Sequence, residues 1–101
     1  MEIIYSPSEN ILRITMIGEL DECASTDARA SIDNMLSNNF FHTVIFDMSK
    51  LSFMDSTGIG VLVGRFKQFG KKTVFFVSSP TSTVDKILKL SGIYTIMPKQ
   101  I

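Results

Sequence analysis

From residue 11 onward, short apolar runs alternate with amphipathic segments, and this alternation constrains the fold more than any other feature of the sequence. Residues 11–17 carry apolar side chains at alternate positions, which is typical of a half-buried strand. The run 44–46 is continuously apolar, as buried central strands are, and residues 73–77 form another buried strand. Because a helix is the usual crossover between parallel strands, we expect an α/β fold with a mixed, mostly parallel sheet of about five strands and crossover helices.

The remaining segments predict two further strands and three helices. Residues 2–6 form a strand that pairs as a hairpin with 11–17, and residues 93–97 form a last short strand. The helices follow the second, third and fourth strands, and their apolar positions recur at helical spacing. Capping residues and glycines indicate where these helices begin and end. Asp21 caps the first helix, and the second spans 57–69 and is followed by Gly70 in the left-handed conformation. Ser79 caps the third helix, with Pro80 in its first turn and Gly92 at its end.

The second helix contains glycines that packing against a sheet does not explain. A helical projection places its apolar stripe at five positions: Ile59, Leu62, Val63, Phe66 and Phe69. Gly60 and Gly64 fall outside this stripe, where each costs about 1 kcal/mol relative to alanine. Val61 and Arg65 border the same flank. We therefore expect an exposed interaction face on which the backbone of a partner can approach closely.

Length and composition limit the class of protein. A chain of 101 residues, of which 45% are hydrophobic and 20% charged, predicts one globular domain over residues 1–101. No apolar run approaches the length of about 20 residues that spans a bilayer, and the N-terminus lacks the basic segment of a secretory signal. Cys23 is the single cysteine, which excludes an internal disulfide. We expect a cytoplasmic protein without membrane contact.

The charges are divided between the two halves of the chain, although the net charge is zero. Residues 1–55 carry nine acidic and three basic residues, and residues 56–101 carry one acidic and seven basic residues. A basic half is one mark of nucleic-acid binding. Here Phe66 and Phe69, which stand between the cations, fall on the apolar stripe, so only a short basic edge remains. We expect no direct contact with nucleic acid, and a polarised surface that orients a protein partner.

The chain lacks the residue patterns of a self-sufficient enzyme. The position two before Ser56 is Met54 rather than the glycine of a nucleophile elbow, and the single histidine, His42, precedes a strand at the opposite end of the sheet. A phosphate-binding loop and metal ligands at helical spacing are also absent from the sequence. We therefore assign no catalytic residue, no metal site and no cofactor.

A hydroxyl group at the start of the second helix is the most distinctive chemical feature that remains. Asp55, Ser56 and Thr57 all suit an N-cap, so starting the helix is the simplest role for them. An accessible serine at a helix N-terminus is also a good phosphate acceptor, because the helix dipole and the free amides stabilise the added charge. A phosphate would bring about −1.5 to −2 charges into the interaction face. The sequence therefore favours a substrate of a separate kinase.

The segment 51–68, LSFMDSTGIGVLVGRFKQ, strongly resembles the signature of STAS-domain anti-sigma factor antagonists. The loop 18–21, GELD, resembles the first loop of this family, and 91–93 matches its last helix-to-strand junction. Within the family, 64–68 is most similar to the sporulation branch, which acts in the sigma F pathway. The general-stress branch also carries Asp-Ser-Thr-Gly and is the alternative.

The resemblance implies a partner switch. The unmodified antagonist binds an anti-sigma factor that is also a serine kinase, and this binding releases a sigma factor. The kinase phosphorylates the serine directly after the motif aspartate, here Ser56, and a serine phosphatase resets it; Mg-ATP belongs to the kinase. The partner-binding positions are those carried over from the family and those of the glycine flank: Glu19, Asp21, Asp55, Thr57, Gly58, Ile59, Gly60, Val61, Gly64 and Arg65.

Members of the family usually continue into a further C-terminal helix, whereas this chain stops at 97–101. The resemblance thus predicts a STAS fold with a shortened C-terminal helix region, a less covered sheet, and a monomer or weak dimer.

Two other classes of protein stay open. A receiver-type domain would accept a phosphate on Asp47 at the end of a buried strand, although the acidic pair that holds Mg²⁺ is missing. A small-ligand sensor has no polar cluster to support it.

Overall fold

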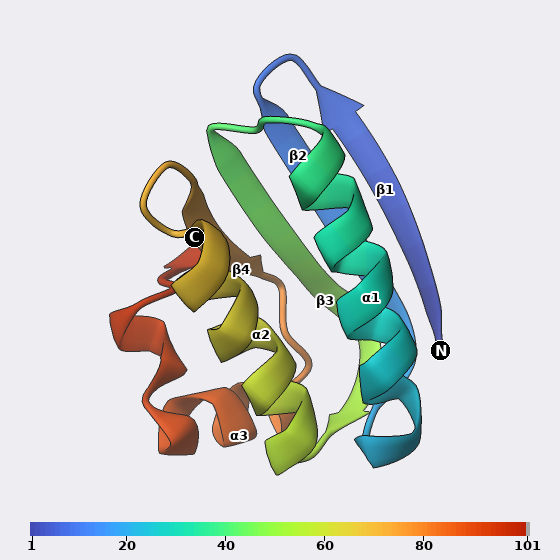
Figure 1. Cartoon of the computed structure of the whole chain (residues 1–101). Coiled ribbons are helices and arrows are strands. Elements are labelled where there is room, and N and C mark those ends of the chain that lie inside the picture. The colour runs from blue at the N-terminus through green and yellow to red at the C-terminus, as the bar shows by residue number, and fades with distance from the viewer. Residues whose placement is uncertain (101) are drawn as a thin grey trace.

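A five-stranded sheet is the framework of the computed structural model, which describes residues 1–100. The strands lie in the order β1-β2-β3-β4-β5, with β1 antiparallel to β2 and each later strand parallel to its neighbour (Figure 1). Their bounds are Glu2–Ser8 for β1, Ile11–Leu20 for β2, Thr43–Met54 for β3, Val74–Ser78 for β4 and Lys99–Gln100 for β5. The expected mixed, mostly parallel sheet is confirmed.

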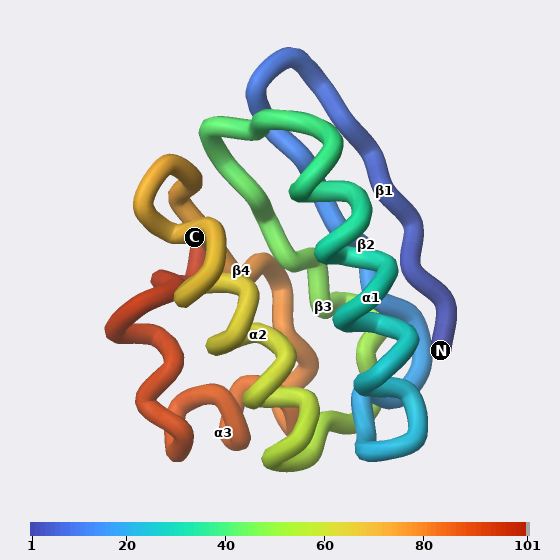
Figure 2. The backbone as a smooth tube through the Cα atoms, in the orientation of Figure 1, coloured from blue at the N-terminus to red at the C-terminus, as the bar shows by residue number. Residues whose placement is uncertain are grey.

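Three helices connect the parallel strands. The helices α1 (Glu22–Asn38), α2 (Ser56–Phe69) and α3 (Ser82–Ser91) follow β2, β3 and β4, and a short 3-10 helix, η1 (Ile93–Thr95), precedes β5. Figures 1 and 2 show α1 and α2 side by side in front of the sheet. The core lies between these layers and includes alternate strand residues and one stripe of each helix: Leu12, Ile14, Met16, Val44, Phe46, Met48, Phe75 and Val77 from the strands, and Ala28, Ile32, Leu62, Val84 and Leu88 from the helices.

β3 is longer than the sequence indicates, and its extension positions the loops that follow. The predicted segment 44–46 is only its buried middle, and β3 pairs with β2 as far as Leu20 opposite Met54. Because β2 and β3 are parallel, their carboxyl ends lie next to each other at one end of the sheet. In parallel sheets this end is where loops gather functional residues.

The start of α3 differs from the prediction. Ser79 has a left-handed φ of 53°, and Thr81 is the N-cap, accepting a hydrogen bond from Val84 N at 3.4 Å. The hydroxyl of Thr81 also donates to Leu51 O at 3.2 Å, which ties the cap to β3. Pro80 therefore lies before the helix rather than in its first turn.

The ends of α2 and of the sheet also differ. Gly70 is right-handed, with a φ of −69°, because its N–H continues the last helical turn by donating to Phe66 O at 2.7 Å. Gly92 has the expected left-handed φ, 78°. Residues 93–97 form η1 and a turn rather than a strand, since their buried positions are four residues apart. The last strand is Lys99–Gln100, paired with β4.

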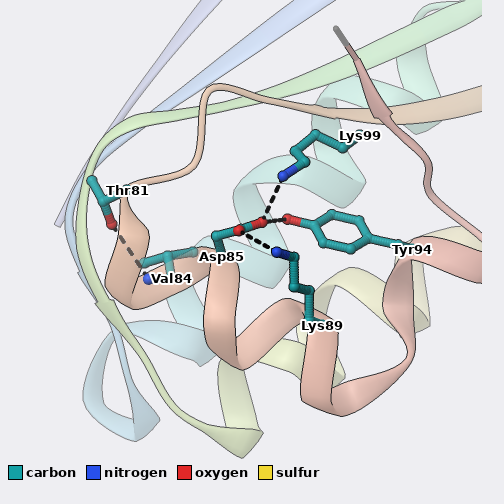
Figure 3. A network of polar contacts seen from close by, with 6 residues as sticks. All are labelled: Thr81, Val84, Asp85, Lys89, Tyr94 and Lys99. Carbon is teal, nitrogen blue, oxygen red and sulfur yellow. Dashed lines mark hydrogen bonds and ion pairs between the residues drawn. The ribbon is translucent and has the colours of Figure 1, made fainter.

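A polar network joins α3, η1 and β5 (Figure 3). Asp85 Oδ1 accepts a hydrogen bond from the Tyr94 hydroxyl at 2.5 Å and another from Lys99 Nζ at 3.0 Å. Asp85 Oδ2 lies 3.2 Å from Lys89 Nζ. These donors, Tyr94 first, lower the pKa of Asp85 to about 2. Burial, and then the bond to Asp85, raise the pKa of Tyr94.

We expect Tyr94→Phe to destabilise the fold at about pH 5 and above, and to have a smaller effect as the pH falls. The folded-state pKa of Asp85 lies below the ordinary value of 3.8, so the network stabilises the fold above that value and is lost as pH falls through about 2. Urea midpoints over roughly pH 2 to 7 measure the change. Tyr5→Phe is the control, because the Tyr5 hydroxyl is paired with the neutral Ser31 hydroxyl at 2.6 Å. If Tyr94→Phe lowered the urea midpoint by the same amount at every pH, as expected for the control, the prediction would be contradicted.

One face of the sheet keeps apolar side chains exposed. The strand alternation turns Ile4, Ile11 and Val74 away from the core, and they are 43% to 45% exposed. The expected monomer or weak dimer stays a prediction. None of the helices formed by residues 1–100 combines the length and the apolar character needed to cross a membrane.

Candidate functional site

The loops after β2 and β3 meet at one end of the sheet, where the carboxylate of Asp55 joins them. Asp55 Oδ1 accepts a hydrogen bond from Gly58 N at 3.0 Å and so caps α2. Asp55 Oδ2 accepts a hydrogen bond at 3.1 Å from the N–H of Glu22, the first residue of α1. Asp21 caps α1 as predicted, by accepting from Ala24 N at 3.0 Å. The side chain of Asp55 therefore stabilises amide groups at the start of both helices.

Gly58 allows the two loops to approach this closely. Asp55 N donates to Leu20 O at 3.4 Å. A Cβ on Gly58 would lie 2.4 Å from the same carbonyl oxygen and 2.8 Å from Met54 Cγ, so no side chain fits. Gly58 is itself buried, and it contributes to any docking surface only by shaping the loops.

Ser56 is the first residue of α2, and it is exposed. Because Asp55 is the N-cap, the hydroxyl of Ser56 is not needed to start the helix. This hydroxyl forms no side-chain hydrogen bond within residues 1–100. It lies at the positive end of the α2 dipole, where added negative charge is stabilised.

Val61 and Arg65 do not border an exposed flank, contrary to the helical projection, because only 5% and 6% of their surfaces are exposed. α2 packs beside α1 as well as against the sheet, so its buried surface is wider than a stripe that faces the sheet alone (Figure 2). Arg65 Nε lies 2.7 Å from Asp33 Oδ1 and forms an ion pair between the two helices. Burial lowers the pKa of Arg65, and the Asp33 carboxylate opposes that shift.

Gly60 and Gly64, unlike Gly58, do lie on an open side of α2. A Cβ at Gly60 or at Gly64 would meet no atom within 4 Å. Leu62 of the predicted stripe is fully buried, and the other members of the stripe are partly buried. The accessible face of α2 at this end contains three exposed and two partly exposed residues: Ser56, Thr57 and Gly60, with Ile59 and Gly64.

An acidic groove of about 620 Å³ lies on one flank of α1, next to the start of β1 and the end of β2. Its lining includes Glu19, Asp21 and Asp27, and it contains no lysine or arginine. The structure thus brings Glu19 and Asp21 together, and it adds Asp27, which the sequence analysis does not single out. The available signal was the charge of residues 19–33, with five acidic residues and one basic residue. Such a groove suits a cationic side chain.

Asp47 does not occupy the position expected of a phosphate acceptor in a receiver domain. It lies within β3 rather than at its end, because the strand continues to Met54. Its Oδ2 lies 3.4 Å from Arg13 Nη1, and its Oδ1 accepts from Ser49 N at 3.1 Å. Partial burial raises the pKa of Asp47, but the bonds from Ser49 and the charge of Arg13 together lower it below its ordinary value. In the part of the chain that the structure describes, no group of three His, Cys, Asp or Glu side chains could hold a metal ion.

The sheet order, the crossover helices and the exposed serine beside an acidic loop define a small α/β domain of the STAS class. The family model described as the STAS domain matches residues 3–100, and the chain belongs to this family. It is 30% identical to the anti-sigma F factor antagonist of Paenibacillus polymyxa, in a match that covers 97% of this chain and 85% of that protein.

Two solved structures have the same fold, and their sequence identity to this chain is slightly lower. The anti-sigma factor antagonist SpoIIAA in its unphosphorylated form matches with a TM-score of 0.83 and 27% identity, over 99% of this chain and 89% of that chain. The Bacillus cell fate determinant SpoIIAA in the phosphorylated form matches with a TM-score of 0.71 and 27% identity, over 99% of this chain and 92% of that chain. The family resemblance and the STAS fold expected from the sequence are confirmed.

Proposed function

We propose that this chain is an anti-sigma factor antagonist of the SpoIIAA type, which binds an anti-sigma factor with serine kinase activity in the cytoplasm and so releases sigma F. Phosphorylation of Ser56 ends this binding, and a serine phosphatase restores the active form. The proposal is carried by the exposed hydroxyl of Ser56 at the start of a helix that Asp55 already caps. The names of the similar proteins support the class of partner, and one of them is solved in a phosphorylated form.

The surroundings of Ser56 support binding and switching at the same place. The acidic groove with Glu19, Asp21 and Asp27 suits a basic part of the anti-sigma factor. Gly60, one turn beyond Ser56, lets the partner approach the backbone of α2 closely. Closing this interface over a phosphate would bury a group of about −1.5 to −2 charges, which is costly without paired cations. In this proposal the chain has no catalytic residue of its own, because the kinase holds Mg-ATP.

We expect the anti-sigma F factor of the same organism, with Mg-ATP, to add one acid-stable phosphate to this chain, on Ser56. Intact-mass measurement and peptide mapping locate the phosphate, and Ser56→Ala should remain unmodified while retaining its fold. Ser82→Ala is the matched control, since Ser82 is also an exposed first residue of a helix, α3. It should be phosphorylated like the wild-type chain. Full modification of Ser56→Ala, or an acid-labile phosphate on Asp47, would contradict the proposal.

A further inference from the structure

A second groove lies on the other flank of α1, between α1 and α2. It has a volume of about 340 Å³ and is lined by three residues of each helix: Ser25, Thr26 and Arg29 of α1, and Thr57, Gly60 and Val61 of α2. The groove stays open at Gly60, where a Cβ would meet no atom within 4 Å. Farther along the helices, Arg65 of α2 and Asp33 of α1 form their ion pair of 2.7 Å. Thr57 directly follows Ser56, so the groove adjoins the proposed phosphorylation site.

The charge of this groove is positive. None of its lining residues is acidic, and Arg29 forms no ion pair with a carboxylate of residues 1–100. The nearby carboxylate of Asp33 is already paired with Arg65. Burial lowers the pKa of Arg65, and the neighbouring guanidinium of Arg29 lowers it further. A positive charge that no carboxylate compensates therefore remains at Arg29.

The groove also contains hydrogen-bond donors from both helices. Thr26 of α1 and Thr57 of α2, which both carry a hydroxyl, line the groove, and both residues are exposed. Neither hydroxyl forms a side-chain hydrogen bond within the described residues. A guanidinium with two free hydroxyls is a donor set that suits a carboxylate, which accepts hydrogen bonds through both oxygens.

The negative charge on the other flank of α1 limits which kinds of molecule can bind in the groove between α1 and α2. Glu19, Asp21 and Asp27 line the acidic groove there, and they would repel an extended polyanion such as nucleic acid. A protein surface that carries one acidic side chain for the Arg29 groove and basic side chains for the acidic groove matches both flanks. The N-terminal half of α1 then lies as a ridge between two contacts of opposite sign, which fixes the orientation of the partner.

We propose that the groove between α1 and α2 receives an aspartate or glutamate side chain of the docked anti-sigma factor, with Arg29 as its ion-pair partner. This inference rests on the proposed function. It also gives phosphorylation a direct electrostatic effect, because a phosphate on Ser56 would lie beside the groove and repel the incoming carboxylate. Arg29 is then a specificity-determining residue that the family signature in α2 does not contain.

Isothermal titration calorimetry with the purified anti-sigma F factor of the same organism tests this proposal. We expect Arg29→Ala to weaken binding by about tenfold and Arg29→Glu by more, since close interfacial charge pairs couple strongly. Lys72→Glu is the control with the same change of charge, at an exposed position beyond the far end of α2. It should bind like the wild-type chain. Arg29 is exposed, so thermal unfolding of its variants should match that of the wild-type chain.

The outcomes separate the groove from the function on which it rests. If the wild-type chain does not bind, the proposed function fails and the inference fails with it. If the wild-type chain binds but Arg29→Glu binds equally well, or loses no more affinity than Lys72→Glu, the groove is not the contact and the proposed function stands. Changing the exposed acidic residues of the anti-sigma factor to lysine one at a time should yield one variant that restores binding to Arg29→Glu. Failure of every such variant would overturn a carboxylate as the occupant.

Discussion

Phosphorylation of Ser56 is expected to weaken binding of the anti-sigma factor by at least about a hundredfold, which corresponds to about 2.7 kcal/mol. The phosphate would stand on the exposed first residue of α2, within one turn of Gly60, where the proposed partner approaches most closely. It would add about −1.5 to −2 charges beside the carboxylate of Asp55. No cation is available there to pair with the phosphate without cost, because Arg29 is needed for the partner and Arg65, farther along α2, is buried and paired with Asp33.

The same phosphate is expected to leave the fold intact. Asp55, rather than Ser56, accepts the hydrogen bond from Gly58 N that caps α2. The positive end of a helix dipole favours negative charge, usually by about 0.3 to 1 kcal/mol. Ser56→Asp should therefore unfold at a urea concentration close to that of the wild-type chain, while binding more weakly.

Genetically encoded phosphoserine at position 56 allows both quantities to be measured without the kinase. Calorimetric titration gives the affinity for the anti-sigma factor, and urea unfolding gives the stability. A chain with phosphoserine at position 82 controls for the added charge, because Ser82 starts α3 instead of α2. Undiminished binding by the chain phosphorylated on Ser56 would reject the switch, and loss of its fold would reject the assignment of capping to Asp55.

Gly58→Ala is expected to destabilise the fold by about 3 kcal/mol, at the upper end of the usual range for overpacking. In an exposed helix interior the same change stabilises the fold by up to about 1 kcal/mol. The sign of the change in the free energy of unfolding therefore shows whether position 58 has room for a side chain. Here the new Cβ would lie 2.4 Å from Leu20 O, and a backbone oxygen cannot rotate away as a flexible side chain can. Relief requires the β2 loop to separate from α2, which weakens the bonds of Asp55 to Leu20 O and Glu22 N.

Gly60→Ala and Gly64→Ala are matched controls in the same helix. A Cβ at either position meets no atom within 4 Å, so each change should raise the free energy of unfolding by about 0.5 to 1 kcal/mol. Urea unfolding of the three variants, monitored by far-ultraviolet circular dichroism, gives the comparison. If Gly58→Ala were as stable as these two controls, the close approach of Leu20 to α2 would not limit the residue at position 58.

The order of the strands and helices as far as α3 was predictable because each of these segments has a clear hydrophobic period, whereas the last strand, expected at 93–97, lies at Lys99–Gln100. The cap at Asp21 was predictable for a similar reason, since its hydrogen bond to Ala24 N depends on residues close in the sequence. The candidate site followed from a long signature around Ser56, and the structure adds that Asp55 is the cap that leaves this serine unengaged.

Features that depend on contacts between distant segments could not be predicted in this way. Burial of Val61 and Arg65 requires α1 to lie beside α2, which a projection of one helix does not contain. The start of α3 is set by the bond from Thr81 to Leu51 O, 30 residues earlier in the chain. The groove around Arg29 likewise exists only once two helices are packed, so a single exposed cation in α1 gave no signal.

The bridge that Asp55 makes between two helix starts also bears on the entropy of binding. Its hydrogen bonds to Glu22 N and Gly58 N, at 3.1 Å and 3.0 Å, hold the β2 loop and the first turn of α2 in one arrangement before any partner arrives. When a partner binds a surface that is already ordered, little conformational entropy is lost, so the same contacts give a higher affinity. The rigidity of this end of the domain thus favours tight binding of the proposed partner.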